Sequence, residues 1–194
     1  MNIDTEQETS KTDLSRSKSL AFVDYIINRC QANNGLRAAL KRADNPATEY
    51  QSWEVLAGFQ INLEHENQRL PYATIAAAIA RTKVEKNGTI KIGQAIARCY
   101  EDGNASDQAK AKLRRLLACD SVPEACRILR PLFSLIEAKG GLTLNYARLL
   151  DDLLWFSHDD SQLRIKARWA QDFYQPAGSR ALGYGKPAVG GKDE

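Results

Sequence analysis

Apolar residues recur along the chain at spacings of three and four, which is the spacing of one face of an α-helix. The first such segment, LAFVDYIINRC (20–30), can be capped by Ser17 or Ser19. An Asn-Asn-Gly stop at 33–35 separates it from a shorter segment, LRAALKRA (36–43). We therefore predict that a pair of helices opens the chain.

The same spacing continues through the middle of the chain. Trp53, Leu56 and Gln60 indicate a short helix, and Pro71 can start an alanine-rich helix over 71–84. The segment EKNGTI (85–90) is a turn sequence without alternating neighbours, which favours a loop over a hairpin. A helix over 92–100 follows.

Capping residues and helix breakers delimit the second half. Ser106, Ser121 and Thr143 are each followed by an apolar-periodic segment. The predicted helices cover 107–120, 123–139 (opened by Pro123 and ended by Gly140-Gly141), 144–156 and 159–174. No segment alternates with the two-residue period of a strand, and no repeat of 20 to 50 residues is visible. We predict an all-α fold of seven to eight short helices in two small bundles.

Polar and glycine-rich stretches divide the chain further. The N-terminus is too polar to bury, and the end of the chain is rich in glycine and proline. We expect a disordered head (1–16), an N-terminal helical bundle (17–84), a connecting loop and helix (85–106), a C-terminal helical bundle (107–174) and a flexible tail (175–194).

Composition places the chain among ordinary globular proteins, with 43% hydrophobic and 26% charged residues. Residues 1–16 hold no apolar signal-peptide core, and the longest apolar run, 73–80, is far shorter than the ~20 residues of a membrane span. We therefore expect a cytoplasmic chain without a membrane partner. The four cysteines form no CxxC pair, so neither a disulfide framework nor a zinc site is indicated.

Catalytic chemistry has few candidate residues. The chain holds two histidines, and the SHDD segment (157–160) resembles half of a metal phosphohydrolase site, for which only His65 could supply another imidazole. The alternative is that Ser157, Asp159 and Asp160 favour a helix N-terminus. No phosphate-cradling glycine motif occurs. We predict a non-enzyme with no metal and no cofactor, and keep a metal-dependent hydrolase as the least favoured hypothesis.

Charge is nearly balanced overall, with 27 lysines and arginines against 24 acidic residues. The balance fails locally, because between Lys110 and Arg130 six cations meet only Asp120 and Glu124. On helical spacing, Lys110 and Arg114 share one face, Arg127 and Arg130 share another, and Arg37 and Lys41 form a third ridge.

Each ridge alone could be a solvated helix face, but three ridges with few acids between them favour a polyanion. Arginine forks would hold phosphates without reading base identity. The helix over 144–156 is too acidic and apolar for the major groove, which argues against a helix-turn-helix regulator. Three other arginines have carboxylates four residues away, so ion pairs are expected for Arg148 with Asp152, Asp160 with Arg164, and Arg168 with Asp172.

A series of segments together resembles a known family. The segments are GLRAALKRA (35–43), IKIGQAIAR (90–98), LRRLLACDS (113–121), ILRPLF (128–133) and RIKARWAQDFY (164–174). In order and spacing they are similar to the CasB-type small subunit of the type I-E CRISPR Cascade effector complex, over roughly residues 20–174.

The resemblance implies an all-helical, non-enzymatic subunit that self-associates as a dimer among the other Cascade protein subunits. It implies contacts with guide RNA and target DNA and stabilisation of the displaced strand of the R-loop, where base pairing reads sequence and protein supplies charge. The matching residues are Arg37, Lys41, Arg42, Arg130, Arg164, Lys166 and Arg168.

The face argument alone adds Lys110, Arg114 and Arg127. Gln94 stands where relatives can carry a cation, and Arg98, one turn on, could replace it. The competing hypothesis is a helical protein-binding adaptor whose arginines dock acidic partners. Trp53, Trp155 and Trp169 could stack on bases, but their apolar neighbours favour core or subunit-interface positions.

Overall fold

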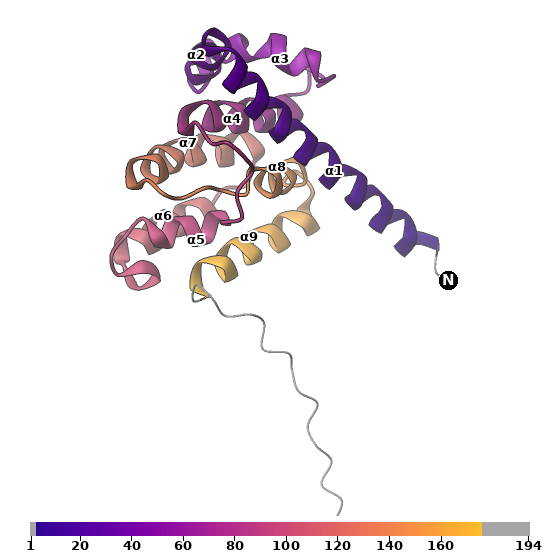
Figure 1. The fold of residues 1–194 in the computed structure, drawn as a ribbon. Helices are drawn as coiled ribbons and strands as arrows, with labels where there is room; N and C mark the ends of the chain where they lie inside the picture. The colour runs from indigo at the N-terminus through magenta and orange to yellow at the C-terminus, as the bar shows by residue number, and fades with distance from the viewer. Residues whose placement is uncertain (1–2, 176–194) are drawn as a thin grey trace, which may run out of the picture.

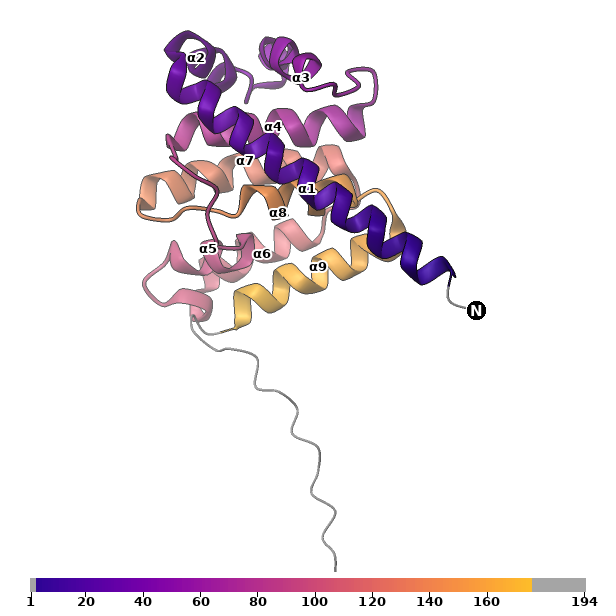
Figure 2. The same cartoon turned by 45° about the vertical axis from the view of Figure 1, so that its right-hand side comes forward.

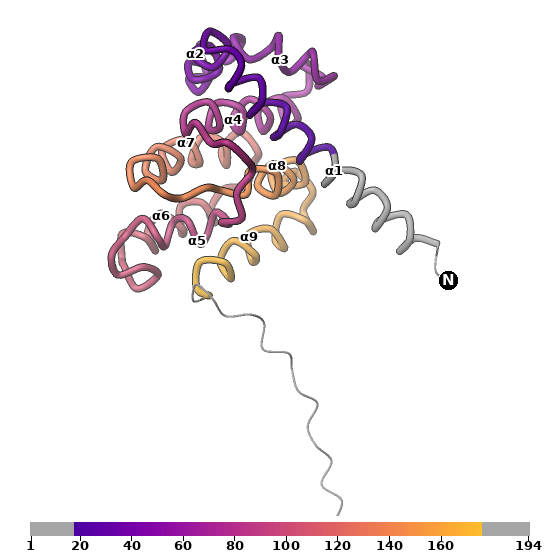
Figure 3. Tube along the Cα trace, in the orientation of Figure 1, coloured from indigo at the N-terminus to yellow at the C-terminus, as the bar shows by residue number. Residues whose placement is uncertain are grey.

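The computed structural model describes the backbone from residue 3 to residue 175 and side chains from residue 18 onward; Figure 3 draws the chain before residue 18 and after residue 175 in grey. The backbone of residues 3–16, within the predicted disordered head (1–16), is helical, and its side chains are not described. The predicted tail (175–194) lies outside the described residues except for its first residue, so both stay predictions.

Over residues 3–175 the backbone forms nine α-helices and two 3₁₀ helices and no strand, which confirms the all-α prediction. The helices are α1 (Ile3–Ala32), α2 (Asn34–Arg42), α3 (Trp53–Gly58), α4 (Glu66–Thr82), α5 (Ile92–Arg98), α6 (Asp107–Leu117), α7 (Val122–Lys139), α8 (Tyr146–Leu154) and α9 (Asp159–Tyr174), with 3₁₀ helices at Pro46–Ser52 and Gly103–Ala105.

The helices stack in layers between two ends (Figure 1). Helices α2 and α3 form one end, α4, α7 and α8 lie in the middle, and α5, α6 and α9 form the other end. Helix α1 crosses the stack and packs on α4 and α8 (Figure 2). The main pairs within the stack are α4 with α7 and α5 with α9.

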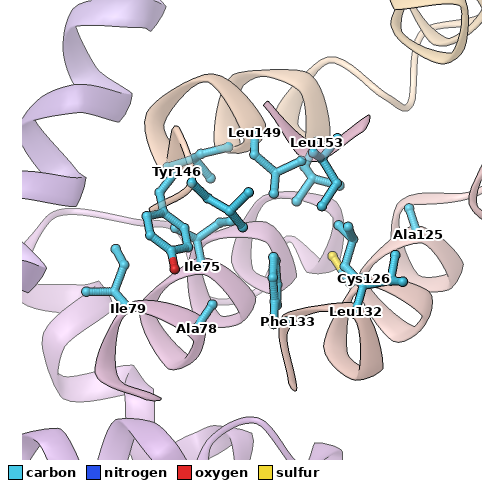
Figure 4. Close-up of a cluster of buried hydrophobic side chains, with 14 of the residues drawn as sticks. Ile75, Ala78, Ile79, Ala125, Cys126, Leu132, Phe133, Tyr146, Leu149 and Leu153 are labelled. Carbon is cyan, nitrogen blue, oxygen red and sulfur yellow. The ribbon is translucent and has the colours of Figure 1, made fainter. Parts of the chain in front are cut away.

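Aliphatic and aromatic side chains from α4, α7 and α8 fill the middle layer. Figure 4 shows Ile75 and Ile79 of α4 near Tyr146 of α8, with Phe133 of α7 beside them. Their burial removes apolar surface from water, which is the main favourable term in folding. Buried residues from both predicted bundles join one hydrophobic cluster, and the division into two domains stays a prediction.

Capping residues explain where most helices begin. The Ser106 hydroxyl accepts from the Ala109 amide of α6, and the Ser121 hydroxyl accepts from the Glu124 amide of α7, as predicted. The predicted Thr143 cap is wrong, because Asn145 caps α8 by accepting from the Arg148 amide at 2.9 Å. Asparagine is the stronger capping residue of the two.

Two other predicted helix starts are wrong. Helix α1 begins at Ile3, so it starts at neither Ser17 nor Ser19, and the buried Ser19 hydroxyl donates to Asp151 Oδ1 at 2.6 Å. Helix α4 begins at Glu66, and Pro71 lies within it, fully buried. A proline inside a helix removes one backbone hydrogen bond, and its ring crowds the preceding turn. The free energy gained by burying the whole 70–80 segment outweighs that cost here.

The segment between α4 and α5 is a loop, as predicted, and it is fastened to α8. Asn87 Oδ1 accepts from the Tyr146 and Ala147 amides at 2.8 and 3.3 Å, adding a second cap to α8. Ile90 pairs with Leu144 in an isolated parallel bridge. These contacts fix α5 relative to the middle layer.

Candidate nucleic-acid interface

One carboxylate joins the end of α2 to α7. Asp44 follows the C-cap residue of α2, Ala43, and its Oδ1 lies 3.7 Å from Nε of Arg130 on α7. Arg81, in the last turn of α4, also pairs with Asp44 through its Nη2. Two arginines from different helices therefore share one acidic side chain.

Arg81 was not among the predicted site residues. Its guanidinium also contacts α7, donating to Ser134 Oγ at 3.2 Å and lying 3.8 Å from Glu137 Oε2. The sequence places Arg81 at the end of an alanine-rich helix and gives no sign that α2 and α7 meet there. Proximity to Arg130 emerges only from the packing of α4 against both helices.

A second acidic residue joins α9 to the turn between α6 and α7. Lys166 Nζ lies 3.1 Å from Asp120 Oδ1, and the Asp120 amide donates to Glu124 Oε2. Glu124 in turn lies 3.6 Å from Arg127, one turn before Arg130 on α7. Lys166, Arg127 and Arg130 therefore lie in sequence across α9 and α7.

The cations of α2 extend this series past Asp44. Lys41 and Arg42 are exposed in the last turn of α2, and Arg42 Nε donates to Gln51 Oε1 at 2.8 Å. Arg37 is half-buried one turn earlier. We define the cationic track as Lys166, Arg127, Arg130, Arg81, Lys41 and Arg42.

Helix α6 carries a separate group of exposed cations. Lys110 lies 3.5 Å from Asp107 in the first turn of α6. Lys112, Arg114 and Arg115 are exposed and form no ion pair within residues 18–175. The expected unpaired excess over 110–130 is wrong for Lys110, Arg127 and Arg130, since each has a carboxylate within 4 Å, and holds for the other three.

The predicted cations of α9 divide between two faces. Lys166 faces α6 and α7, whereas Arg168 Nη2 lies 2.6 Å from Asp152 Oδ1 on α8. The expected pair of Arg168 with Asp172 is wrong, because Lys91 takes Asp172 at 2.6 Å. Buried carboxylates require close partners, and these come from facing helices.

The other two expected pairs on α8 and α9 are also replaced. Arg164 Nε donates to the backbone oxygen of Asp160 at 3.0 Å and not to its carboxylate. No direct Arg148–Asp152 ion pair forms, because Asp152 is bound instead by Arg168 and by the Trp169 indole, which donates to Oδ2 at 2.7 Å. The nearby Arg148 charge still acts on Asp152.

Asp152 illustrates the balance of burial against charge in this region. Burial raises the pKa of the Asp152 carboxyl, and the Arg168 charge, the Trp169 hydrogen bond and the Arg148 charge act in the opposite direction. Removal from water is the largest of these effects. Arg168 is therefore engaged with the core of the α8–α9 pair as much as with the surface.

Gln94 and Arg98, the positions on α5 that the family resemblance singled out, lie outside the cationic track. Gln94 Oε1 accepts from the Lys91 amide and so helps to start α5. Arg98 is half-buried at the end of α5 and shares no carboxylate with the cationic track. The proposed replacement of a cation at 94 by Arg98 stays a prediction.

Tryptophans and histidines separate clearly by exposure. Trp169 is buried in the core, Trp155 is half-buried, and Trp53 is exposed. His65 and His158 are exposed at the N-caps of α4 and α9.

From residue 18 to 175, no three histidine, cysteine or acidic side chains are arranged to hold a metal ion. None of the helices described combines the length and apolar content that crossing a bilayer requires.

Comparisons with known proteins agree with this architecture. The model of the family "CRISPR-associated protein Cse2" matches residues 36–174. The crystal structure of CasB from M. ruber superposes with a TM-score of 0.65 at 24% identity, covering 81% of this chain and 92% of that one.

A second solved structure shows the same fold. CasB from Thermobifida fusca gives a TM-score of 0.62 at 15% identity, covering 81% of this chain and 98% of the other. No curated protein matches the sequence. The family match spans most of the chain and confirms the resemblance found in the sequence. The chain therefore belongs to the Cse2 family, that of the CasB-type small subunits of the type I-E CRISPR Cascade complex.

Proposed function

We propose that this subunit is non-catalytic and binds nucleic acid through the cationic track, stabilising guide RNA, target DNA and the displaced strand of the R-loop. The observation that carries the proposal is the sharing of Asp44 by Arg81 of α4 and Arg130 of α7, together with the Asp120–Lys166 pair that joins α9 to the turn before α7. Cations drawn from several helices can contact more phosphates of a sugar-phosphate chain than those of one helix.

The more exposed ion pairs do not prevent this function, whereas Arg130 and Arg81 are only 15% and 24% exposed where they meet Asp44. Asp120 is 87% exposed and Lys166 17%, so water and salt screen this pair from the side of Asp120. Arg127 is 61% exposed, and its ion pair with Glu124 is long, at 3.6 Å. A phosphate can displace or share such partners at small cost, and the exposed cations of α6 and Arg164 on α9 add to the attraction.

A double substitution tests the track. Replacing Arg127 and Arg130 with alanine is expected to weaken binding of a single-stranded oligonucleotide and to flatten the dependence of log affinity on log salt by about 1.4, the value for two lost phosphate contacts. Helicity should persist because Arg81 retains Asp44. Circular dichroism and fluorescence titrations over several salt concentrations measure both quantities.

The control is a variant with the same loss of charge outside the track. Lys86 and Lys139 are exposed, and their double alanine variant should leave the salt slope near that of the wild-type protein. An equal loss of slope in both variants would show that only net charge matters. An unchanged slope in the arginine variant would remove α7 from the interface.

A protein-binding adaptor without nucleic-acid contact is the second candidate. Five predicted site cations already lie near carboxylates, namely Lys110, Arg127, Arg130, Lys166 and Arg168. Absence of salt-dependent oligonucleotide binding by the wild-type protein would support the adaptor.

A further inference from the structure

The short helices that follow α2 expose an aromatic face. Tyr50 and Trp53 are 59% and 40% exposed. The Trp53 amide donates to the Tyr50 carbonyl at the end of the 3₁₀ helix, and residues three apart in such a helix project from the same side. Glu54 and Ala57 are exposed on the same face, at the spacing of one helix side.

Trp53 of the aromatic face is held in place by a contact with Arg69. The Arg69 guanidinium lies 5.6 Å from the Trp53 ring centroid, and it is fixed by Glu49 at 2.7 Å and by the Leu63 carbonyl at 2.5 Å. One side of the indole therefore has a charged neighbour with no freedom to move away. A pre-ordered exposed tryptophan loses little conformational entropy on binding.

The rim of this face is acidic. Residues 45–68 contain four glutamates and no lysine or arginine, and the two arginines that flank this segment at the face are engaged, Arg42 by Gln51 and Arg69 by Glu49. Glu49 is used by Arg69, whereas Glu54, Glu64 and Glu66 are exposed. The Leu63 carbonyl accepts from Arg69, so the backbone of the adjacent Glu64 lies near the arginine that contacts Trp53. Phosphates would be repelled here, although exposed aromatics alone could stack on bases.

We propose that the face formed by Tyr50, Trp53, Glu54 and Ala57 is a docking surface for a cationic, apolar segment of another protein subunit. Tyrosine and tryptophan are the residues most enriched at the centres of protein interfaces, and an acidic rim selects a basic partner. This inference rests on the proposed function, in which the subunit works inside a multisubunit complex. It gives the α3 end a role different from that of the cationic track.

The test measures binding to a complex assembled from the other Cascade subunits of the same source and their guide RNA. Trp53→Ala should weaken binding about tenfold, as expected for a central aromatic contact. Tyr174→Ser, which removes a 54% exposed aromatic at the opposite end, should change it little. Circular dichroism and thermal unfolding check that both variants fold.

Charge reversal distinguishes a protein occupant from nucleic acid. Glu54→Lys should weaken binding to the complex several-fold and leave oligonucleotide affinity of the isolated subunit close to that of Glu101→Lys, a matched exposed reversal outside the face. If Trp53→Ala lowers oligonucleotide affinity and Glu54→Lys raises it more than Glu101→Lys, the face stacks bases and the proposal is overturned.

Two further outcomes keep the proposals separate. Unchanged binding of both Trp53→Ala and Glu54→Lys to the complex overturns the docking surface, while salt-dependent oligonucleotide binding by the same samples leaves the proposed function intact. Failure of the wild-type protein to bind oligonucleotide refutes the cationic track, and the effect of Trp53→Ala on assembly still decides the docking surface.

Discussion

At the scale of single residues, burial determines the ionisation of the cysteine thiols. Cys30, Cys119 and Cys126 lie in the core, and burial raises their thiol pKa values to about 11, 11 and 12. Thiols with such values are protonated at neutral pH and unreactive. These three residues are free thiols that pack in the core as small apolar side chains.

These thiols predict a loss of stability at alkaline pH. The unfolded thiols ionise near pH 9.0, whereas the folded ones do so near 11 to 12, so their contribution to stability is complete below pH 9 and falls as pH rises from 9 towards 12. Urea unfolding at pH 8 and pH 10.5 should show a lower free energy at the higher pH.

A thiol reagent checks the same residues independently. At pH 8 the folded protein should label slowly at Cys30, Cys119 and Cys126, and Cys99, which is only half-buried, should react first. Rapid labelling of all four cysteines without denaturant would contradict the burial on which the pH dependence rests.

At the scale of helices, close backbone approach joins α5 to α9. A Cβ atom added at Gly93 would lie 2.2 Å from the Trp169 carbonyl oxygen and 2.7 Å from the Phe173 amide nitrogen. Both neighbours are backbone atoms of a helix and cannot rotate away. Glycine is therefore required here for packing and not for an unusual backbone angle.

Gly93→Ala is expected to destabilise the protein by about 3 kcal/mol, the upper end of the usual cost of overpacking. Chemical denaturation measures the loss. Gly58→Ala serves as control, because its nearest neighbour is the Tyr25 hydroxyl at 3.7 Å, and it should be neutral or stabilising. A near-neutral Gly93→Ala would mean that α5 and α9 are further apart than described.

Sequence patterns predicted where helices lie better than they predicted which helices pack together. Caps such as Ser106 and Ser121 act within one turn, so their chemistry is readable locally. The second cap of α8 comes from Asn87, nearly sixty residues earlier, and no local pattern contains it. The same limit applies to the site, where Asp44 and Arg81 reach Arg130 only through the folded arrangement.

Over the whole molecule, charge is separated more sharply than its total of +3 indicates. The segment 45–68 that contains α3 is acidic, α6 carries three cations that form no ion pair within residues 18–175, and the cationic track runs between α9 and α2. The charge balance along 110–130 predicted the cations of α6 and α7. It contained no sign of Asp44, which comes from a distant segment and lies on the same surface.

Acidic partners in the track should limit its affinity for polyanions. Asp120→Asn removes the carboxylate that holds Lys166 and preserves the side-chain size. Oligonucleotide binding should strengthen a few-fold, and the salt slope should steepen by about 0.7 if Lys166 gains one phosphate contact on a single strand. Weaker binding would show that Asp120 positions Lys166 productively instead of masking it. Fluorescence anisotropy over a salt series measures both.

Helix α1 gives the molecule a diagonal brace. It packs on α2, α4 and α8, with Ser19 bonded to Asp151. Sliding of one layer over another would have to break this brace. The α2 end and the middle layer therefore keep a constant arrangement, so that under both proposals a partner docked at α3 and a strand bound on α7 would be held at a fixed distance from each other.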